Sequence, residues 1–445
     1  MPKARSACRG AKKRQGRSSG RSKTSGVASV PHLGYDTNMD QRTLQPKKRP
    51  CVDATLLCML ALMAFGYLLL HDLLGGTLLS HSAWDSYTLQ AMAWRRGSLS
   101  LGQNYPWLEL AVYQGEYYVS FPPFPSVVLL PFTFLFGENT PNNLIIAIVT
   151  MATAALAYRC LRRAGMRETC AVLGALLLTW GSNLMWMSTN GGVWFMAQAL
   201  NMFLLTWALH CAMCKRRVLA YALVAFAVGC RPFSALAFFP LFLFFYLQDR
   251  RPDEGFCKTA LRQWKAFLIP LGVAAAYMWY NYARFGSVLE FGHNYLPEFT
   301  EAENGQFHLS YIFANLKNIF LRPIAFGEGL SLEYPVFDGF LFYVANPFFL
   351  LLFGQIVSDA RHRQMDAMRY VLLAAMLLNL LLLCWHKTFG GWQFGARYTC
   401  DLLPLALAYL CLAKRQSLCR WECFAAWFGI LLNVYGALAM NFLHG

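Results

Sequence analysis

Long apolar segments recur along almost the whole chain and restrict it to one kind of fold. Runs of roughly 15–20 apolar residues follow one another from Ala54 to the C-terminus, and each is about long enough to cross a 30 Å hydrocarbon core as a helix. Backbone groups in lipid must pair within their own segment, so helices are the expected form. Only 14% of the 445 residues are charged, against about 25% in soluble proteins. The sequence therefore predicts an all-α integral membrane protein.

The apolar runs predict a polytopic bundle of about 11–13 spans, with interfacial helices in the first outer loop. The predicted spans lie near residues 54–74, 143–160, 169–187, 191–213, 217–230, 233–247, 265–283, 338–357, 369–386, 400–413 and 424–441. Residues 51–445 are thus expected to form one transmembrane domain.

The first 50 residues differ sharply in composition from the rest. They hold 13 Lys and Arg against two Asp, a net charge of +11 out of +16 for the whole chain. Rich in Ser and Gly and without an apolar run, residues 1–50 are expected to be a disordered cytoplasmic tail that touches anionic headgroups. A nucleic-acid-binding arm is the weaker alternative, and no nucleic-acid partner is predicted.

Positive charge at the ends of the spans predicts the orientation. With the tail inside and the spans alternating, every inner loop is short and basic, as the positive-inside rule requires. These loops are Arg159–Arg167, Lys215–Arg217, Gln248–Lys265, Ser358–Arg369 and Lys414–Glu422. The N-terminus is therefore predicted to be cytoplasmic and the site extracytoplasmic, and the tail composition and cysteine use favour a bacterial plasma membrane.

One apolar stretch does not fit this alternation. Val127–Phe136 is short and contains Pro131. Counted as a full span, it would reverse every later loop and place most Lys and Arg clusters outside. We interpret it as a re-entrant or interfacial segment.

The first outer loop carries the first candidate residues. Asp85 precedes Ser86–Arg96, where apolar residues recur at the spacing of a helix lying along the interface. Asp85 could be the N-cap of that helix or an acid that acts on a substrate. Glu109 and the pair Tyr117 and Tyr118 follow in the same loop; tyrosines there are also typical of a membrane interface.

The order of these features resembles a known family. After the first span come an acidic residue, an interfacial helix ending in Gly97, Gly115-Glu-Tyr-Tyr118, the pair Pro122-Pro123 and a stretch closing in Phe136-Gly137. This resembles the GT-C type membrane glycosyltransferases, in the superfamily of protein O-mannosyltransferases and lipid A aminoarabinose transferases. A second stretch, Gly390–Tyr398, supports the likeness; it contains Trp392 and Arg397 and is followed by Asp401 and Pro404.

The resemblance implies a polyprenyl-phosphate sugar as donor and an acceptor outside the cytoplasm, which could be a cell-envelope glycan, a lipid or a protein. No cofactor is predicted to be required. In that superfamily the first acid acts on the acceptor, a role that maps onto Asp85, with Glu109 as an auxiliary acid. The family usually has a lysine or another polar residue before the proline pair, whereas this chain has Phe121.

The implied reaction matches the residue types available. An inverting transfer needs a carboxylate to take the acceptor's proton, and cations or donors to stabilise the leaving phosphate. The predicted phosphate contacts are Arg231, Arg397, Lys387 and His386, and the predicted substrate-loop residues are Tyr117, Tyr118, Trp392 and His293. Arg397 could instead pair with Asp401. No His/Asp/Glu cluster has ligand spacing, so no metal site is predicted, although some GT-C enzymes use a divalent cation.

Two other functions remain open. A transporter or flippase commonly carries ionisable residues near the middle of its spans and an internal repeat, and neither is evident here. A polysaccharide polymerase or ligase with a diphosphate-linked donor would share a site on the outer face.

Overall fold

The computed structural model describes residues 53–337 and 339–442, so the predicted tail over residues 1–50 lies outside the described residues. Within them, six helices are long and apolar enough to cross a membrane. They are α1 (Ala54–Leu73), α4 (Asn142–Arg163), α7 (Val193–Met213), the joined η3 and α9 (Pro232–Ala237 and Phe238–Asp249), α16 (Ala367–Trp385) and α18 (Arg420–Phe442). The all-α polytopic architecture is thereby confirmed.

The remaining predicted spans correspond to helices that are shorter or less apolar. These are α5 (Glu168–Thr179), α6 (Leu184–Met187), α8 (Arg217–Val228), α11 (Leu268–Phe285), α14 (Phe342–Ala345), α15 (Phe348–Arg361) and, after the 3₁₀ helix η7 (Arg397–Leu402), α17 (Leu403–Leu412). Further short elements are η1 (Thr77–Leu79), η2 (Gly137–Asn139), α10 (Phe256–Leu261), η4 (Trp264–Phe267), η5 (His293–Tyr295) and η6 (Glu328–Leu330).

Two predicted spans are interrupted rather than continuous. The span predicted over 169–187 divides into α5 and α6, and the one over 338–357 divides into α14 and α15 just before Pro347. The two breaks face each other: the Asn183 backbone N–H donates to Asn346 Oδ1 at 2.8 Å, and Asn346 Nδ2 donates to Asn183 Oδ1 at 2.8 Å. Side-chain amides thus pair with polar groups that a broken helix would leave unsatisfied in an apolar interior.

Small side chains bring α7 and α8 close together in the core. Ala208 and Ala212 of α7 and Ala220 and Ala227 of α8 are all buried. Membrane helices associate through small residues of this kind, since lipid provides no hydrophobic force between them. Alanine on both sides therefore explains how the α7–α8 hairpin packs within the bundle.

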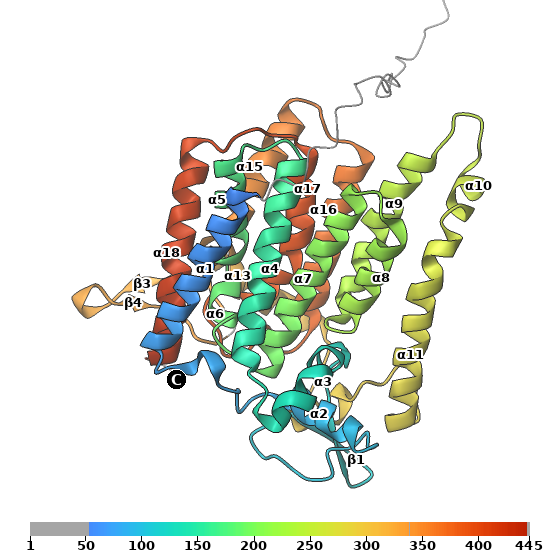
Figure 1. Ribbon diagram of the computed structural model, residues 1–445, viewed down its shortest axis with the longest axis vertical. Coiled ribbons are helices and arrows are strands. Elements are labelled where there is room, and N and C mark those ends of the chain that lie inside the picture. Colours follow the sequence, from blue (N-terminus) through green and yellow to red (C-terminus); the bar gives the residue numbers. More distant parts are fainter. Residues whose placement is uncertain (1–52, 338, 443–445) are drawn as a thin grey trace, which may run out of the picture. The chain divides into compact units, whose positions relative to one another are not determined.

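The helices alternate in direction, as the charge pattern predicts. In Figure 1 the turns α4–α5, α7–α8, α9–α10, α15–α16 and α17–α18, which contain the predicted inner loops, lie at the upper end. The first outer loop, with α2 (Ser86–Arg95) and α3 (Phe124–Phe136), lies at the lower end. Basic and site-bearing segments are therefore separated at opposite ends of the bundle.

The first outer segment is a small folded layer at the lower end. It includes α2, α3 and a hairpin of β1 (Leu110–Tyr113) with β2 (Glu116–Val119), in which Leu110 pairs with Val119. The stretch 127–136 belongs to α3, whose 13 residues extend about 20 Å, too short for a hydrocarbon core of about 30 Å. Figure 1 places α3 beside α2 at the end of the bundle, which agrees with an interfacial or re-entrant segment.

The segment between α11 and α14 contains more regular structure than the sequence indicates. It holds α12 (Pro297–Thr300), α13 (Leu309–Leu321) and a hairpin of β3 (Ala325–Phe326) with β4 (Leu332–Glu333). Asn315 anchors α13 to the end of α16 by donating to the carbonyls of Cys384 and His386 at 2.9 and 3.0 Å. This contact holds the segment against the bundle near the site.

Candidate active site

A cavity of about 730 Å³ opens among the outer segments. Its walls come from segments far apart in sequence: the first outer loop, the start of α7, the segment around α12, and the loop between α16 and η7. The lining residues are Trp84, Glu109, Phe121, Trp186, Asn190, Trp194, Phe195, His293, Leu296, Glu298, Phe299, Phe337, His386, Thr388, Gly390, Gly391, Trp392, Arg397, Tyr398, Met440 and Asn441. Five of the sequence-predicted site residues are among them: Glu109, His293, His386, Trp392 and Arg397.

Arg397 brings a buried positive charge to this cavity. Its guanidinium donates to the Gly390 carbonyl from Nε at 3.0 Å and Nη2 at 2.7 Å, and to Gln198 Oε1 at 2.9 Å. None of the ion pairs found among the described residues involves Arg397. Burial lowers the pKa of Arg397, as expected of a cation without a carboxylate partner. The cavity therefore carries a cation placed to receive an anion.

The loop before η7 is shaped to hold Arg397 in place. Gly390, Gly391 and Gly395 have φ values of +93°, +60° and +75°, which favour glycine. A Cβ on Gly395 would come within 2.3 Å of the Asn183 side chain. Gln393 accepts from the Arg397 backbone N–H at 2.7 Å. The glycine-rich motif thus turns the backbone so that its own carbonyl faces the guanidinium.

Glu109 is the acid of the first outer loop that lies in the cavity. Its Oε2 accepts a hydrogen bond from Trp194 Nε1 at 3.1 Å, whereas no bond to Oε1 is present among the described residues. Withdrawal from bulk water raises the pKa of the Glu109 carboxyl, Glu298 adds to the rise, and Trp194 and Arg397 oppose it. A carboxylate with one free oxygen and a raised pKa is suited to accept a proton.

A second carboxylate, Glu298, lines the cavity and was not singled out from the sequence. The Thr388 hydroxyl donates to its Oε1, and Lys387 Nζ donates to its backbone carbonyl at 2.8 Å. Lys387 is therefore attached beside the cavity, not among its lining residues. Within 53–337 and 339–442, no three His, Cys, Asp or Glu side chains are grouped closely enough to hold a metal ion.

The two predicted histidines lie side by side in the cavity wall. His293 Nδ1 donates to the Ser120 carbonyl at 2.8 Å, and His386 Nδ1 donates to the Thr388 carbonyl at 2.9 Å. His386 Nε2 accepts from Gln306 at 3.1 Å, an assignment that follows from the amide's donor role. Burial lowers the pKa of His293 to about 3 and also lowers that of His386. Both rings are neutral at physiological pH, so neither adds a positive charge for phosphate.

Asp85 lies behind the cavity wall. It caps α2: Oδ1 accepts from the backbone N–H groups of Tyr87 and Thr88 at 3.0 and 3.1 Å. Asn142 Nδ2 donates to Oδ2 at 2.7 Å, and the Thr88 hydroxyl donates to the same oxygen. With 4% of its surface exposed, Asp85 is engaged on both oxygens and ties α2 to the start of α4.

Arg231 lies just beneath the cavity, paired with Asp401. Its Nε is 2.8 Å from Asp401 Oδ2, and its guanidinium sits 4.4 Å from the centre of the Tyr398 ring, which lines the cavity. Gln198 and Asn201 also donate to Asp401, at 3.4 and 3.3 Å. The carboxylate that could have paired with Arg397 is therefore engaged by Arg231.

The remaining predicted residues divide between the cavity and the β1–β2 hairpin. Trp392 lines the cavity, with its ring 5.7 Å from that of Trp186. Tyr117 and Tyr118 belong to β2, and Tyr118 packs edge-on against Phe285 at 5.3 Å, outside the lining. Trp84 lines the cavity but was not predicted as a site residue. Its position immediately before Asp85 was the sequence signal that could have indicated it.

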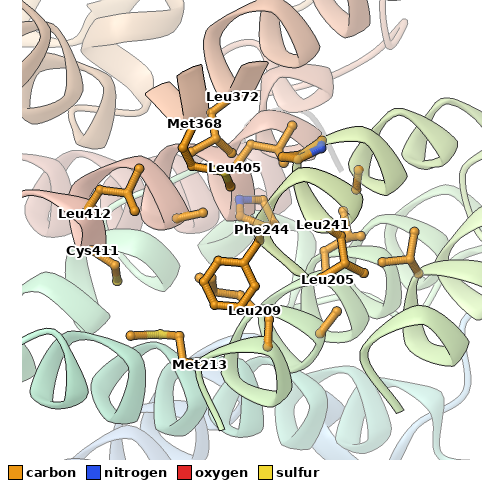
Figure 2. A pocket seen from close by; sticks show the side chains of 17 residues that line it. Leu205, Leu209, Met213, Leu241, Phe244, Met368, Leu372, Leu405, Cys411 and Leu412 are labelled. Carbon is orange, nitrogen blue, oxygen red and sulfur yellow. The ribbon is translucent and has the colours of Figure 1, made fainter. Parts of the chain in front are cut away.

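An apolar groove lies along α17 and begins at Pro404, just after η7. Figure 2 shows its side chains, contributed by α7, α8, η3, α9, α16 and α17. Leu205, Leu241, Phe244, Leu372 and Leu405 are among them. Leu405 follows Asp401 by one helical turn, so the groove continues along α17 from the segment that carries Arg397 and Tyr398.

The arrangement is similar to that of solved membrane glycosyltransferases. The crystal structure of ArnT from Cupriavidus metallidurans, bound to undecaprenyl phosphate, matches with a TM-score of 0.50 and 13% identity, over 82% of this chain and 61% of that one. This chain has a GT-C type fold. The Archaeoglobus fulgidus oligosaccharyltransferase in its apo form has a TM-score of 0.48 and 13% identity, over 87% of this chain and 55% of its own.

The GT-C match covers only part of those larger proteins. This chain spans 55% and 61% of the lengths of the two solved structures. No protein-family model matches the sequence, and no curated protein matches it either. The GT-C likeness therefore concerns the fold.

Proposed function

We propose that the protein is a membrane glycosyltransferase that moves a sugar from a polyprenyl-phosphate donor to an acceptor outside the cytoplasm. The observation that carries the proposal is the cavity, in which an arginine without a carboxylate partner and a carboxylate with a free oxygen face the same space. A GT-C fold with an undecaprenyl-phosphate-bound relative in structure is consistent with this assignment.

Arg397 is the proposed phosphate contact. Its three hydrogen bonds use the Nε–H and one N–H of each terminal nitrogen. One N–H therefore remains on each of the two terminal nitrogens. Those two donors can meet two phosphate oxygens at once, and the attraction strengthens as the leaving phosphate gains charge. Lys387, at the cavity edge, adds a second positive charge. His386 is neutral and contributes only the surface of its ring to the cavity wall.

Glu109 is the proposed base, in preference to Asp85. It lines the cavity and keeps Oε1 free, whereas Asp85 has both oxygens engaged behind the wall. In an inverting transfer, Glu109 takes the proton of the acceptor's hydroxyl or amine while the acceptor atom that loses it bonds to the anomeric carbon. The bond from that carbon to the phosphate oxygen breaks, and the electron pair leaves with the phosphate beside Arg397.

The apolar groove is the proposed site of the isoprenoid chain. Its lining is almost entirely carbon and sulfur, and it follows α17 from the segment that holds Arg397. A polyprenyl chain entering from the bilayer would bury apolar surface there while its phosphate reaches the cavity. His293 and Trp392, on opposite segments of the wall, are the proposed contacts for the sugar.

The test is transfer of radiolabelled sugar from polyprenyl-monophosphate donors in membranes that contain wild type, Glu109→Gln or Asp85→Asn. We expect transfer by the wild type and a loss of about 10²–10⁴-fold in Glu109→Gln at equal protein level. Transfer only from diphosphate-linked donors would favour a polymerase or ligase. Failure with every lipid-linked donor, together with passage of a lipid or solute across vesicles, would favour a transporter.

A further inference from the structure

Four tryptophans form a continuous aromatic wall on one side of the cavity. The ring centres of Trp84 and Trp194 are 5.8 Å apart, and those of Trp186 and Trp392 are 5.7 Å apart. Phe195 joins the two pairs, at 6.1 Å from Trp194 and 4.8 Å from Trp186. All five residues line the cavity.

Packing explains the deep part of this wall but not its outer part. Trp186 and Phe195 are 3% and 7% exposed, as expected of core residues, whereas Trp84 is 43% exposed. An indole left open in a cavity, beside other aromatic rings, marks a place where a ligand covers apolar surface. The open ring is the neighbour of Trp194, whose N–H donates to the proposed base Glu109.

Polar groups suited to hydroxyls line the same cavity as this open ring. Asn190 and Asn441 line the same cavity. Asn190 Oδ1 accepts from the Gly192 backbone N–H at 2.8 Å, so its amide N–H groups are the donors left for a ligand. An indole face with side-chain amides and a carboxylate beside it matches a molecule that has one flat C–H face and hydroxyls around its edge. The negative face of the indole attracts the positively polarised C–H groups of such a ring.

We infer that the acceptor is a carbohydrate, whose sugar ring stacks on Trp84 and Trp194 so that one hydroxyl reaches Glu109. This inference rests on the proposed function and names its acceptor class. The hydroxyl's proton passes to Glu109 Oε1, its oxygen bonds to the donor's anomeric carbon, and the phosphate leaves with the electron pair of the broken bond.

A peptide acceptor is the alternative that the geometry disfavours. Extended peptides bind by adding a strand to a free backbone edge. The extended backbone at the cavity, at Phe337 and Trp392, is already paired in an antiparallel bridge, and Phe307 pairs with His386 in the same way. These two bridged stretches of the cavity wall therefore offer no free strand edge to a peptide.

The binding test needs no catalysis. The full chain is labelled with 5-fluorotryptophan, and the ¹⁹F resonance of Trp84 is assigned with Trp84→Phe. Cellobiose, chitobiose, maltose and a serine-containing hexapeptide are added in turn. We expect at least one disaccharide to shift the Trp84 resonance and leave that of Trp427, 58% exposed on α18, unchanged. A shift caused by the hexapeptide alone, or no shift with any disaccharide, would overturn the inference.

The kinetic test separates this inference from the proposed function. Trp84→Ala should raise the acceptor KM about tenfold, the value of one aromatic contact, while kcat and the donor KM stay within about threefold. Trp107→Ala is the matched control, since Trp107 is 52% exposed in the same loop but absent from the cavity lining. Transfer to peptides that Trp84→Ala does not weaken would refute the carbohydrate acceptor and keep the transferase. Sugar binding at Trp84 without transfer from any donor would support the carbohydrate site and refute the transferase.

Discussion

The indole N–H of Trp194, in the first turn of α7, donates to Glu109 Oε2 at 3.1 Å across 85 positions of the chain. A donor to a carboxylate favours its charged form, so this bond lowers the pKa of Glu109 against the rise caused by partial desolvation inside the cavity. A residue of α7 thus helps to set the protonation of the proposed base, which lies in the first outer loop.

Removal of this bond should shift the pH dependence of transfer. Glu109 acts as a base only when it is deprotonated, so activity rises with pH through its pKa, which lies above the ordinary value of a glutamate. Trp194→Phe keeps an aromatic ring and removes the donor, so the acidic limb of the kcat/KM profile should move to higher pH. Measurement of that profile for both proteins decides the point, and an unmoved limb would contradict the role of Glu109.

Replacement of Arg397 should weaken the donor side of the reaction. Arg397→Lys keeps a positive charge but loses the two-pronged geometry and the bonds to Gly390, so kcat/KM for the donor should fall by about 10²–10³. Arg322→Lys is a suitable control, because Arg322 donates to the Phe337 carbonyl and is absent from the cavity lining. Equal losses of kcat/KM in the two variants would show that Arg397 has no specific role in binding the donor phosphate.

Breaking the Arg231–Asp401 pair should affect stability. Asp401→Asn leaves the Arg231 charge without its partner in a mostly buried position, at an expected cost of about 3–5 kcal/mol. Neutralising both residues should recover part of this loss. Thermal unfolding in detergent measures it, with Glu168→Gln as the comparison, because the exposed Arg162–Glu168 pair is worth about 0–1 kcal/mol. Equal midpoints for Asp401→Asn and Glu168→Gln would contradict the prediction.

Asp85→Asn should also act on folding rather than on chemistry. The variant weakens the cap of α2, worth about 1 kcal/mol, and brings two amides together at Asn142. We expect a lower unfolding midpoint and a kcat, per folded molecule, within about threefold of the wild type. If kcat instead falls by orders of magnitude at unchanged stability, the base is Asp85 and the acceptor must approach from behind Trp84.

The proposed orientation can be tested with native and engineered cysteines. Cys257 and Cys419 are exposed in the predicted inner loops, and Gln103 is exposed in the first outer loop. In a background without other cysteines, a membrane-impermeant maleimide should reach residue 103 in Gln103→Cys from outside intact cells. It should reach Cys257 and Cys419 only after the membrane is opened. The opposite labelling pattern would place the cavity in the cytoplasm.

Hydropathy and charge predicted most of the fold, because span length and loop charge are local properties of the chain. The breaks before α6 and α15 were not predicted, since they depend on Asn183 and Asn346 meeting across the bundle. The helix α13 was missed for a similar reason: it is held by Asn315 against the end of α16.

The site was predicted in part. Motif order pointed to Glu109, Trp392 and Arg397, all of which line the cavity. It could not show which arginine pairs with Asp401, because η3 and η7 meet only in the folded chain. Glu298 had no local signal, since its place depends on contacts with Lys387 and Thr388, about 90 residues away.

The unequal lengths of α7 and α8 have a consequence for side reactions. Both helices meet at the basic turn after Met213, yet α7 has 21 residues and α8 has 12, so α8 ends about 14 Å short of the far end of α7. Arg231 follows α8 and lies against Tyr398, so this part of the cavity wall is backed by a segment deeper in the bundle than the first turn of α7. A donor whose phosphate descends that far leaves bulk solvent behind. Hydrolysis, the reaction in which water takes the sugar instead of the acceptor, should therefore be slow unless the acceptor itself is in place.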